Sequence, residues 1–135
     1  MKSKTAIVSM AIVIFIVAAS FTVSQTPKPW PVPDKDSKMA NPVKSDATSL
    51  STGKELWAKH CQSCHGKSGK GDGTKAAKLD THPGDFTDPN VQKETDGDFF
   101  YKISEGRKDM PSFKKKIPDE NDIWSVVNYV RTFKK

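Results

Sequence analysis

The stretch that decides the fold is Cys61-Gln62-Ser63-Cys64-His65, which holds both cysteines of the chain. A Cys-x-x-Cys pair can be a thiol–disulfide active site, half of a zinc site, or the two thioether anchors of a c-type haem. No strand-like run precedes the pair, as a thioredoxin-like dithiol requires, and the three histidines form no second paired cluster that could complete a zinc site. The haem interpretation uses the whole pentapeptide, because the histidine after the second cysteine can bind the iron as its proximal ligand.

Length and composition bound what the chain can be. Its 135 residues correspond to one domain with appendages. Hydrophobic residues make up 35% of the chain, which excludes a large enzyme core and a multi-helix membrane protein. Three tryptophans, seven phenylalanines and 28% charged residues of mixed sign exclude a disordered chain. The folding unit is small, so we expect something besides its apolar side chains to complete the core.

The N-terminus carries an export pattern. Lys2 and Lys4 precede an uncharged, apolar run over residues 6–23. A basic segment followed by such a run is typical of a signal peptide, and the run is also close to the minimum length for spanning a bilayer. Lysines on the N-terminal side of the run place the following residues outside the cytoplasm. We therefore predict that residues 1–24 are a signal peptide or an uncleaved membrane anchor, and that the protein is periplasmic or otherwise extracytoplasmic.

Residues 25–50 differ in composition from both of their neighbours. They contain five prolines and almost no apolar periodicity. Because proline lacks an N–H and fixes φ, this segment is expected to be an extended, semi-rigid linker, with Trp30 as an exposed residue in it. The folding unit is then residues 51–135.

A second axial ligand for a haem iron should come from farther along the chain. Met110 lies beside Pro111 in a glycine- and proline-bounded turn, and His/Met is one of the recognised ligand pairs of haem iron. After the apolar run, the one other methionine is Met39 in the predicted linker. His82 and then His60 are the rival candidates for the sixth ligand, although a solvated histidine is the usual state of a loop residue such as His82.

Residues 51–135 resemble class I monohaem cytochromes c, and bacterial periplasmic members in particular. Several spaced motifs carry the resemblance: Gly53 with Trp57, Cys61–Gly66, Lys67–Gly73, Asp109–Phe113 and Ile123–Arg131. It implies an all-α fold of three to four helices around one covalently attached haem c, with its iron. By the same resemblance, Cys61 and Cys64 bear the haem as thioethers, and His65 and Met110 are the axial ligands of the iron.

The resemblance also implies two contacts within the protein. In this family, the positions of Gly53 and Tyr129 let the N- and C-terminal helices cross closely, and a residue without a Cβ permits such an approach. A proline carbonyl commonly accepts the Nδ1–H of the proximal histidine and so fixes its orientation. Pro83 is the candidate for that role.

Local signals predict where the helices begin and end. Ser51 or Thr52 is expected to cap a helix that runs to about Cys61. The glycine- and proline-rich segment 66–93 predicts a loop with one helical turn at 75–79, in which Leu79 and Phe86 would pack on the haem.

Two further helices are expected after that loop. Thr95 or Asp96 is expected to cap a helix that ends at Gly106. The last helix is expected to start at Pro118 and to have acidic residues in its first turn. Its apolar stripe has helical spacing: Ile123, Val126, Val127, Val130 and Phe133.

By resemblance, the function is single-electron transfer without chemistry on a substrate, so we predict that the protein is not an enzyme. The implied partners are a cytochrome c reductase and a terminal oxidase or other reductase. The chain has a net charge of +6, and basic residues flank both the attachment site and Met110. They are either a solvated face or a rim that steers the protein toward an acidic docking surface: Lys67, Lys70, Lys75, Lys78, Arg107, Lys108 and Lys114–Lys116. Nucleic acid is excluded as a partner, because an exported chain without aromatics interleaved on a basic stripe does not fit one.

An alternative function stays open at this point. In a haem-based sensor or a peroxidase-like protein, Met110 would dissociate and a small ligand would bind the iron in its place. The neighbours of the methionine, Lys108 and Asp109, offer no obvious acid–base pair for peroxide chemistry.

Overall fold

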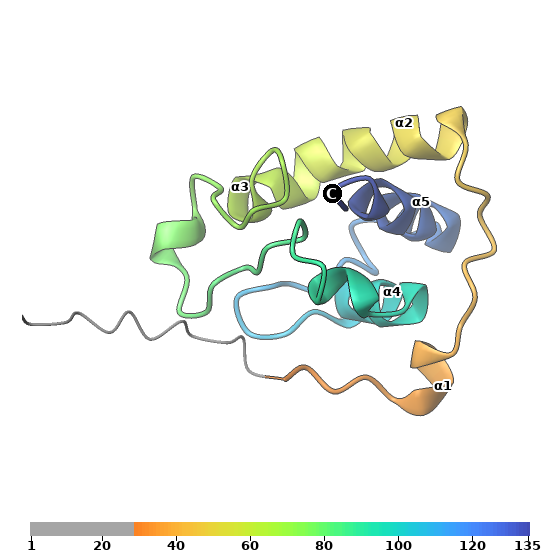
Figure 1. Cartoon of the computed structure of the whole chain (residues 1–135), viewed down its shortest axis with the longest axis horizontal. Coiled ribbons are helices and arrows are strands. Elements are labelled where there is room, and N and C mark those ends of the chain that lie inside the picture. The colour runs from red at the N-terminus through yellow and green to blue at the C-terminus, as the bar shows by residue number, and fades with distance from the viewer. Residues whose placement is uncertain (1–28) are drawn as a thin grey trace, which may run out of the picture.

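A computed structural model describes residues 29–135, and its regular elements are all helical (Figure 1). The α-helices are α1 (Asp34–Ser37), α2 (Ala47–Leu56), α3 (Gln62–His65), α4 (Asp96–Glu105) and α5 (Glu120–Arg131). A π-helical turn, η1, spans Trp57–Cys61, and two 3-10 turns, η2 and η3, span Ala76–Lys78 and Val91–Lys93. The predicted all-α fold is confirmed. The predicted signal or anchor, residues 1–24, lies outside the described residues, and no helix within 29–135 has the length and apolar character that a membrane crossing requires.

The crossing of α2 and α5 is the main packing contact between helices (Figure 1). A Cβ placed on Gly53 would lie 2.1 Å from the carbonyl oxygen of Ser125 and 2.8 Å from the Cβ of Tyr129. Backbone therefore lies directly against backbone, as expected of Gly53 and Tyr129. The predicted stripe of α5 forms the centre of the core, and four of its residues are at most 1% exposed: Ile123, Val126, Val127 and Val130.

The first long helix begins earlier than Ser51 or Thr52, so that part of the prediction is wrong. The carboxylate of Asp46 accepts the N–H groups of Thr48 and Ser49, and the Ser49 hydroxyl accepts the N–H of Asp46. This reciprocal capping box satisfies otherwise unpaired donors and starts α2 at Ala47. The helix therefore begins four residues upstream of the predicted folding unit.

Helix α4 begins and ends as expected, and α5 nearly so. Thr95 and Asp98 form a capping box at the start of α4, and Gly106, with a φ of 69°, follows its last residue. The cap of α5 is Asp119, whose carboxylate accepts the N–H of Asn121, so the helix starts two residues after Pro118.

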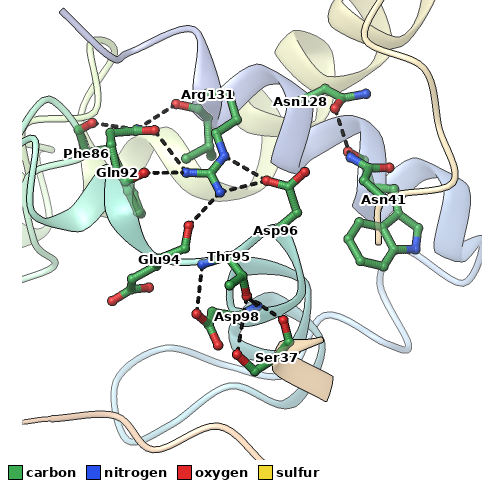
Figure 2. A network of polar contacts seen from close by, with 12 residues as sticks. Ser37, Asn41, Phe86, Gln92, Glu94, Thr95, Asp96, Asp98, Asn128 and Arg131 are labelled. Atoms are coloured by element: carbon green, nitrogen blue, oxygen red, sulfur yellow. Dashed lines mark hydrogen bonds and ion pairs between the residues drawn. The ribbon is translucent and has the colours of Figure 1, made fainter. Parts of the chain in front are cut away.

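The described part of the predicted linker packs against the helices. We call residues 29–46 the strap. In the strap, Ser37 at the end of α1 accepts a hydrogen bond through its carbonyl from the Thr95 hydroxyl at 2.7 Å, and Asn41 donates to the Asn128 side chain at 2.8 Å (Figure 2). The Asn128 amide in turn donates to the carbonyl of Val43. Polar residues that lie between the prolines thus attach this segment to α4 and α5.

Arg131, in the last turn of α5, ties that helix to the segment that leads into α4 (Figure 2). Its guanidinium contacts the Asp96 carboxylate at 2.7 Å and donates to the carbonyl oxygens of Gln92 and Glu94. It also lies 4.6 Å from the ring centroid of Phe99. A planar group with several donors suits this set of acceptors.

Candidate haem-binding site

The pentapeptide lies where the long N-terminal helix ends. Cys61 is the last residue of the π-helical turn, and Cys64 and His65 close α3. Both thiols are free, and Cys61 is buried. Burial, and then the neighbouring Cys64, raise the pKa of Cys61 to about 12. A reactive dithiol needs a lowered thiol pKa, so this environment does not fit thiol–disulfide chemistry.

The zinc interpretation has no ligand set in the described part of the chain. Within residues 29–135, no three side chains of His, Cys, Asp or Glu gather closely enough to hold a metal ion.

The loop after His65 fastens the carboxyl end of α3. Its amides at Gly71, Gly73 and Lys75 donate to the carbonyls of His65, Cys64 and Ser63 at 2.8–3.1 Å. These carbonyls have no partner within the helix, so the loop satisfies them. The buried indole of Trp57 donates to the carbonyl of Gly66 at 3.1 Å. Both cysteines and the histidine therefore sit on backbone that is held from two sides.

The imidazole of His65 sits among aromatic rings. Its centroid lies 5.1 Å from that of Phe86 and 5.7 Å from that of Trp57. Burial, and then the nearby His82, lower the pKa of His65 to about 4, against a smaller opposite effect from the Pro83 backbone. The ring is therefore neutral at physiological pH, which is the form that binds a metal.

The second nitrogen of His65 tests whether a haem fits. Nδ1 is buried, and no group in the described residues meets hydrogen-bond geometry with it, although the Pro83 backbone lies close enough to affect the ring. A metal-bound histidine needs an acceptor for its other N–H. A small movement of Pro83 would supply that acceptor. The neutral histidine, the two unpaired thiols and the nearby carbonyl together fit a covalently attached haem.

Met110 is held in a tight turn of the chain. Arg107 and Met110 exchange two backbone hydrogen bonds of 2.7 and 3.0 Å, an isolated bridge. Lys108 within the turn has a φ of 53°, and a Cβ on Gly106 would lie 2.4 Å from the carbonyl carbon of Pro111. The Met110 side chain is half-buried and packs against the core cluster that includes Cys61.

The two histidines that rival Met110 as the sixth ligand, His82 and His60, lie in different surroundings from it. His82 is exposed, its Cε1 lies 2.5 Å from where a Cβ on Gly71 would be, and its Nδ1 accepts the N–H of Gly84 at 3.1 Å. His60 packs its ring edge-on against Phe113, with centroids 5.9 Å apart. Burial, followed by the charges of Lys59 and Lys116, lowers the pKa of His60.

Comparison with known proteins identifies the family. Residues 48–130 match the family model described as cytochrome c oxidase, cbb3-type, subunit III. The chain belongs to this family. A solved structure titled "KustC0563 c-type cytochrome" is 32% identical, with a TM-score of 0.55, and the match covers 62% of this chain and 98% of that one. The resemblance to class I monohaem cytochromes c is thereby confirmed. The protein is a c-type haem electron-transfer protein, and its domain implies a covalently bound haem c with iron.

A second solved structure shares the fold. It is titled "Kuenenia stuttgartiensis reducing HAO-like protein complex Kustc0457/Kustc0458", and it is 24% identical with a TM-score of 0.62. The match covers 80% of this chain but only 53% of that one, so this chain spans about half of its length. Among curated proteins, none is similar enough to count as a match.

Some residues around the site were missed by the sequence interpretation. Trp30 is half-buried rather than exposed, and its ring lies 4.5 Å from the guanidinium carbon of Arg107. The hydrogen bond from Trp57 to Gly66 was also missed, because side-chain spacing alone does not show which backbone group an indole reaches. The capping box at Asp46 and Ser49 was detectable, since an N-cap residue with a side-chain acceptor three positions later is a helix-start signal.

Proposed function

We propose that this cytochrome c is a single-electron carrier with one haem, in which His65 and Met110 are the axial ligands and Cys61 and Cys64 form the thioethers. The observation that carries the proposal is the Met110 turn, which is closed by two backbone bonds and presents a half-buried thioether to the core that contains Cys61. When bound, the haem supplies one-electron chemistry through its Fe(II)/Fe(III) couple. His82, by comparison, is exposed and already used as a hydrogen-bond acceptor.

The residues of the chain each have a distinct role in this proposal. The cysteines tether the macrocycle to backbone that the 66–75 loop holds in place. Trp57 and Phe86 pack near the His65 imidazole, and the Pro83 carbonyl, after a small movement, would accept the N–H of its Nδ1. Met110 would ligate the iron opposite His65 and so leave no open position for a substrate, and on that basis we propose that the protein is an electron carrier and not an enzyme.

The partners are redox proteins of the same electron-transfer chain. We propose a cytochrome c reductase as donor and a terminal oxidase or other reductase as acceptor. Support comes from the family description, which names an oxidase subunit, and from the Kuenenia neighbour, which belongs to a complex. Basic side chains around the site are exposed and available to an acidic partner surface: Lys67, Lys70, Lys75, Lys78, Lys108, Lys115 and Lys116.

We place the domain outside the cytoplasm on the basis of the N-terminal charge and apolar pattern. The described chain begins beside the Met110 turn, since Arg107 donates to the carbonyl of Pro29 at 2.9 Å. Five residues, 24–28, separate the apolar run from Pro29, and even fully extended they span less than about 20 Å. An uncleaved anchor would therefore hold the Met110 face close to the membrane.

Absorption spectra of the full-length holoprotein test the ligand assignment. The wild type should show a c-type α band on reduction and, when oxidised, the weak near-infrared band of a methionine–iron bond. Met110→Ala should abolish the near-infrared band and keep the α band, because the thioethers and His65 remain. His82→Ala is the matched control and should change neither.

Other outcomes contradict the proposal. A wild-type spectrum without the methionine band, or a band lost in His82→Ala and kept in Met110→Ala, would move the sixth position to another group. A high-spin iron would favour the sensor or peroxidase-like alternative.

A further inference from the structure

The first residues of the strap contact Arg107, whose backbone closes the Met110 turn. The Trp30 ring stacks on the Arg107 guanidinium at 4.5 Å from centroid to Cζ, and the Lys102 ammonium lies 5.8 Å from the same ring. Arg107 also donates from Nη1 to the carbonyl of Pro29. A guanidinium stacked on an indole face is attracted by the ring quadrupole. The start of the strap therefore holds the Arg107 side chain by two contacts, a stacked ring and a hydrogen bond.

The strap itself is anchored elsewhere, so it does not simply follow the turn. α1 packs on the first turn of α4, where a Cβ on Gly97 would lie 2.1 Å from the carbonyl oxygen of Asp36. Farther along, Asn41 is bound to Asn128 of the buried face of α5. Lys102, on which Trp30 also rests, pairs with Glu94 at 2.6 Å. Trp30 thus projects from a segment that two core helices hold in place.

The Met110 turn depends on contacts from outside it, for two reasons. The backbone of Arg107 makes both hydrogen bonds to Met110, so a displacement of the Arg107 backbone is transmitted to the methionine. Lys108, between them, has a left-handed φ of 53°, which is unfavourable for a residue other than glycine. The closed turn is therefore strained at Lys108, and contacts from outside the turn are needed to keep it closed.

We propose that Trp30 is a positioning residue for the sixth ligand: by clasping Arg107, it keeps the turn closed and Met110 in place on the iron. This inference rests on the proposed His65/Met110 ligation. The strap is then part of the redox site, although it precedes the matched family region, residues 48–130. Removing the indole should increase the fraction of molecules in which the sixth position is open.

Imidazole binding to the oxidised, full-length holoprotein measures that fraction. Apparent affinity for an external ligand scales with the population of the open form. Trp30→Leu keeps an apolar side chain but removes the ring face, and we expect imidazole to bind about three- to tenfold more tightly than to the wild type. The reduction potential should fall as well, since methionine ligation raises it. Trp30→Phe, which retains a ring face, should lie between Trp30→Leu and the wild type in both measurements.

Asn41→Ala is the matched control, because it releases the strap from α5 but keeps the packing of α1 on α4, which is the attachment nearer to Trp30 in the chain. It should lower the melting temperature and leave imidazole affinity and reduction potential unchanged. If Trp30→Leu matches the wild type in both, or if Asn41→Ala shifts the affinity as far as Trp30→Leu does, the positioning role is wrong. The wild-type spectrum separates this failure from that of the function: without a methionine–iron band the ligand assignment falls, and this inference falls with it.

Discussion

The α2–α5 crossing and the Met110 turn hold the site from two sides, and they do so by different means. At the crossing, the backbone at Gly53 lies against that of Ser125, over side chains such as Val127 that are fully buried. At the turn, a half-buried methionine is held by two backbone bonds and by the contact between Arg107 and the strap. Packing over a large buried area maintains the first; a few polar contacts maintain the second.

The difference indicates that stability and ligation are carried by separate parts of the molecule. Regions with few buried apolar contacts open at a lower free energy than the core does. Substitutions at the crossing should therefore change the free energy of unfolding, and substitutions at the turn should change how the iron is ligated.

The largest effect is expected from Gly53→Ala. The added methyl would lie 2.1 Å from the Ser125 carbonyl oxygen, which is backbone and cannot turn aside, so the two helices must separate. Overpacking of this kind costs about 3 kcal/mol or more when backbone has to move. We expect a large fall in the melting temperature of the holoprotein, with the methionine–iron band retained in whatever fraction stays folded.

Lys54→Ala is the control for that substitution, since Lys54 is the exposed neighbour of Gly53 in the same helix. It should leave the melting temperature almost unchanged. Wild-type stability in Gly53→Ala would mean that the crossing is looser than the structure shows.

Gly106→Ala is expected to lower stability less than Gly53→Ala does. Unlike Gly53→Ala, it should weaken or abolish the methionine–iron band. Gly106 has a φ of 69°, and a Cβ there would meet the backbone of Pro111 and Ser112 at 2.4 Å. The strain lies where α4 leads into the turn, away from the α2–α5 crossing, and should cost about 1–3 kcal/mol. Absorption and thermal melting of the same sample should show the methionine–iron band lost or weakened, and a smaller fall in melting temperature than in Gly53→Ala. If both variants lost the band in proportion to stability, the two regions would form one cooperative unit.

The crossing could be predicted from sequence, because its signals are local and periodic. The α5 stripe repeats at helical spacing, and the resemblance to class I cytochromes c implied the close approach at Gly53, which a residue without a Cβ permits. Thr95 and Gly106 likewise bound α4 as expected, because caps depend on a few neighbouring residues.

The strap could not be predicted in the same way. Its prolines predict an extended path, but prolines say nothing of what a segment lies against. Its contacts depend on residues far away in sequence, such as Trp30 with Arg107 and Asn41 with Asn128. The site residues themselves were predicted as a set from the pentapeptide and the family pattern, and their ligation of iron stays a prediction.

The smallest effect is expected at the start of α4, where α1 of the strap meets the helical core. Asp98 accepts the N–H of Thr95 at 2.8 Å. Burial acts to raise the pKa of Asp98, but hydrogen bonds from Thr95 and Ser37 and the charge of Lys102 outweigh it and hold that pKa below the ordinary 3.8. The ionised carboxylate therefore stabilises the folded state above pH 3.8, and this contribution is lost as the pH falls below 3.8 through the lowered value.

Asp98→Asn should lower stability at pH 7 by less than about 1 kcal/mol, as expected of a solvent-accessible capping contact. Thermal melting at several pH values should show the difference from the wild type shrinking as the pH falls below 3.8, and disappearing below the lowered pKa of Asp98, where both side chains are uncharged. Asp34→Asn removes the same charge from an exposed residue of α1 and is the control at pH 7, where it should change stability less than Asp98→Asn does. The methionine–iron band at neutral pH should persist in both variants, since neither touches Trp30, Arg107 or the turn. A loss of the band in Asp98→Asn would show that the seating of α1 on α4 also sets the position of Met110, and would extend the ligation-controlling region from the turn to the whole strap.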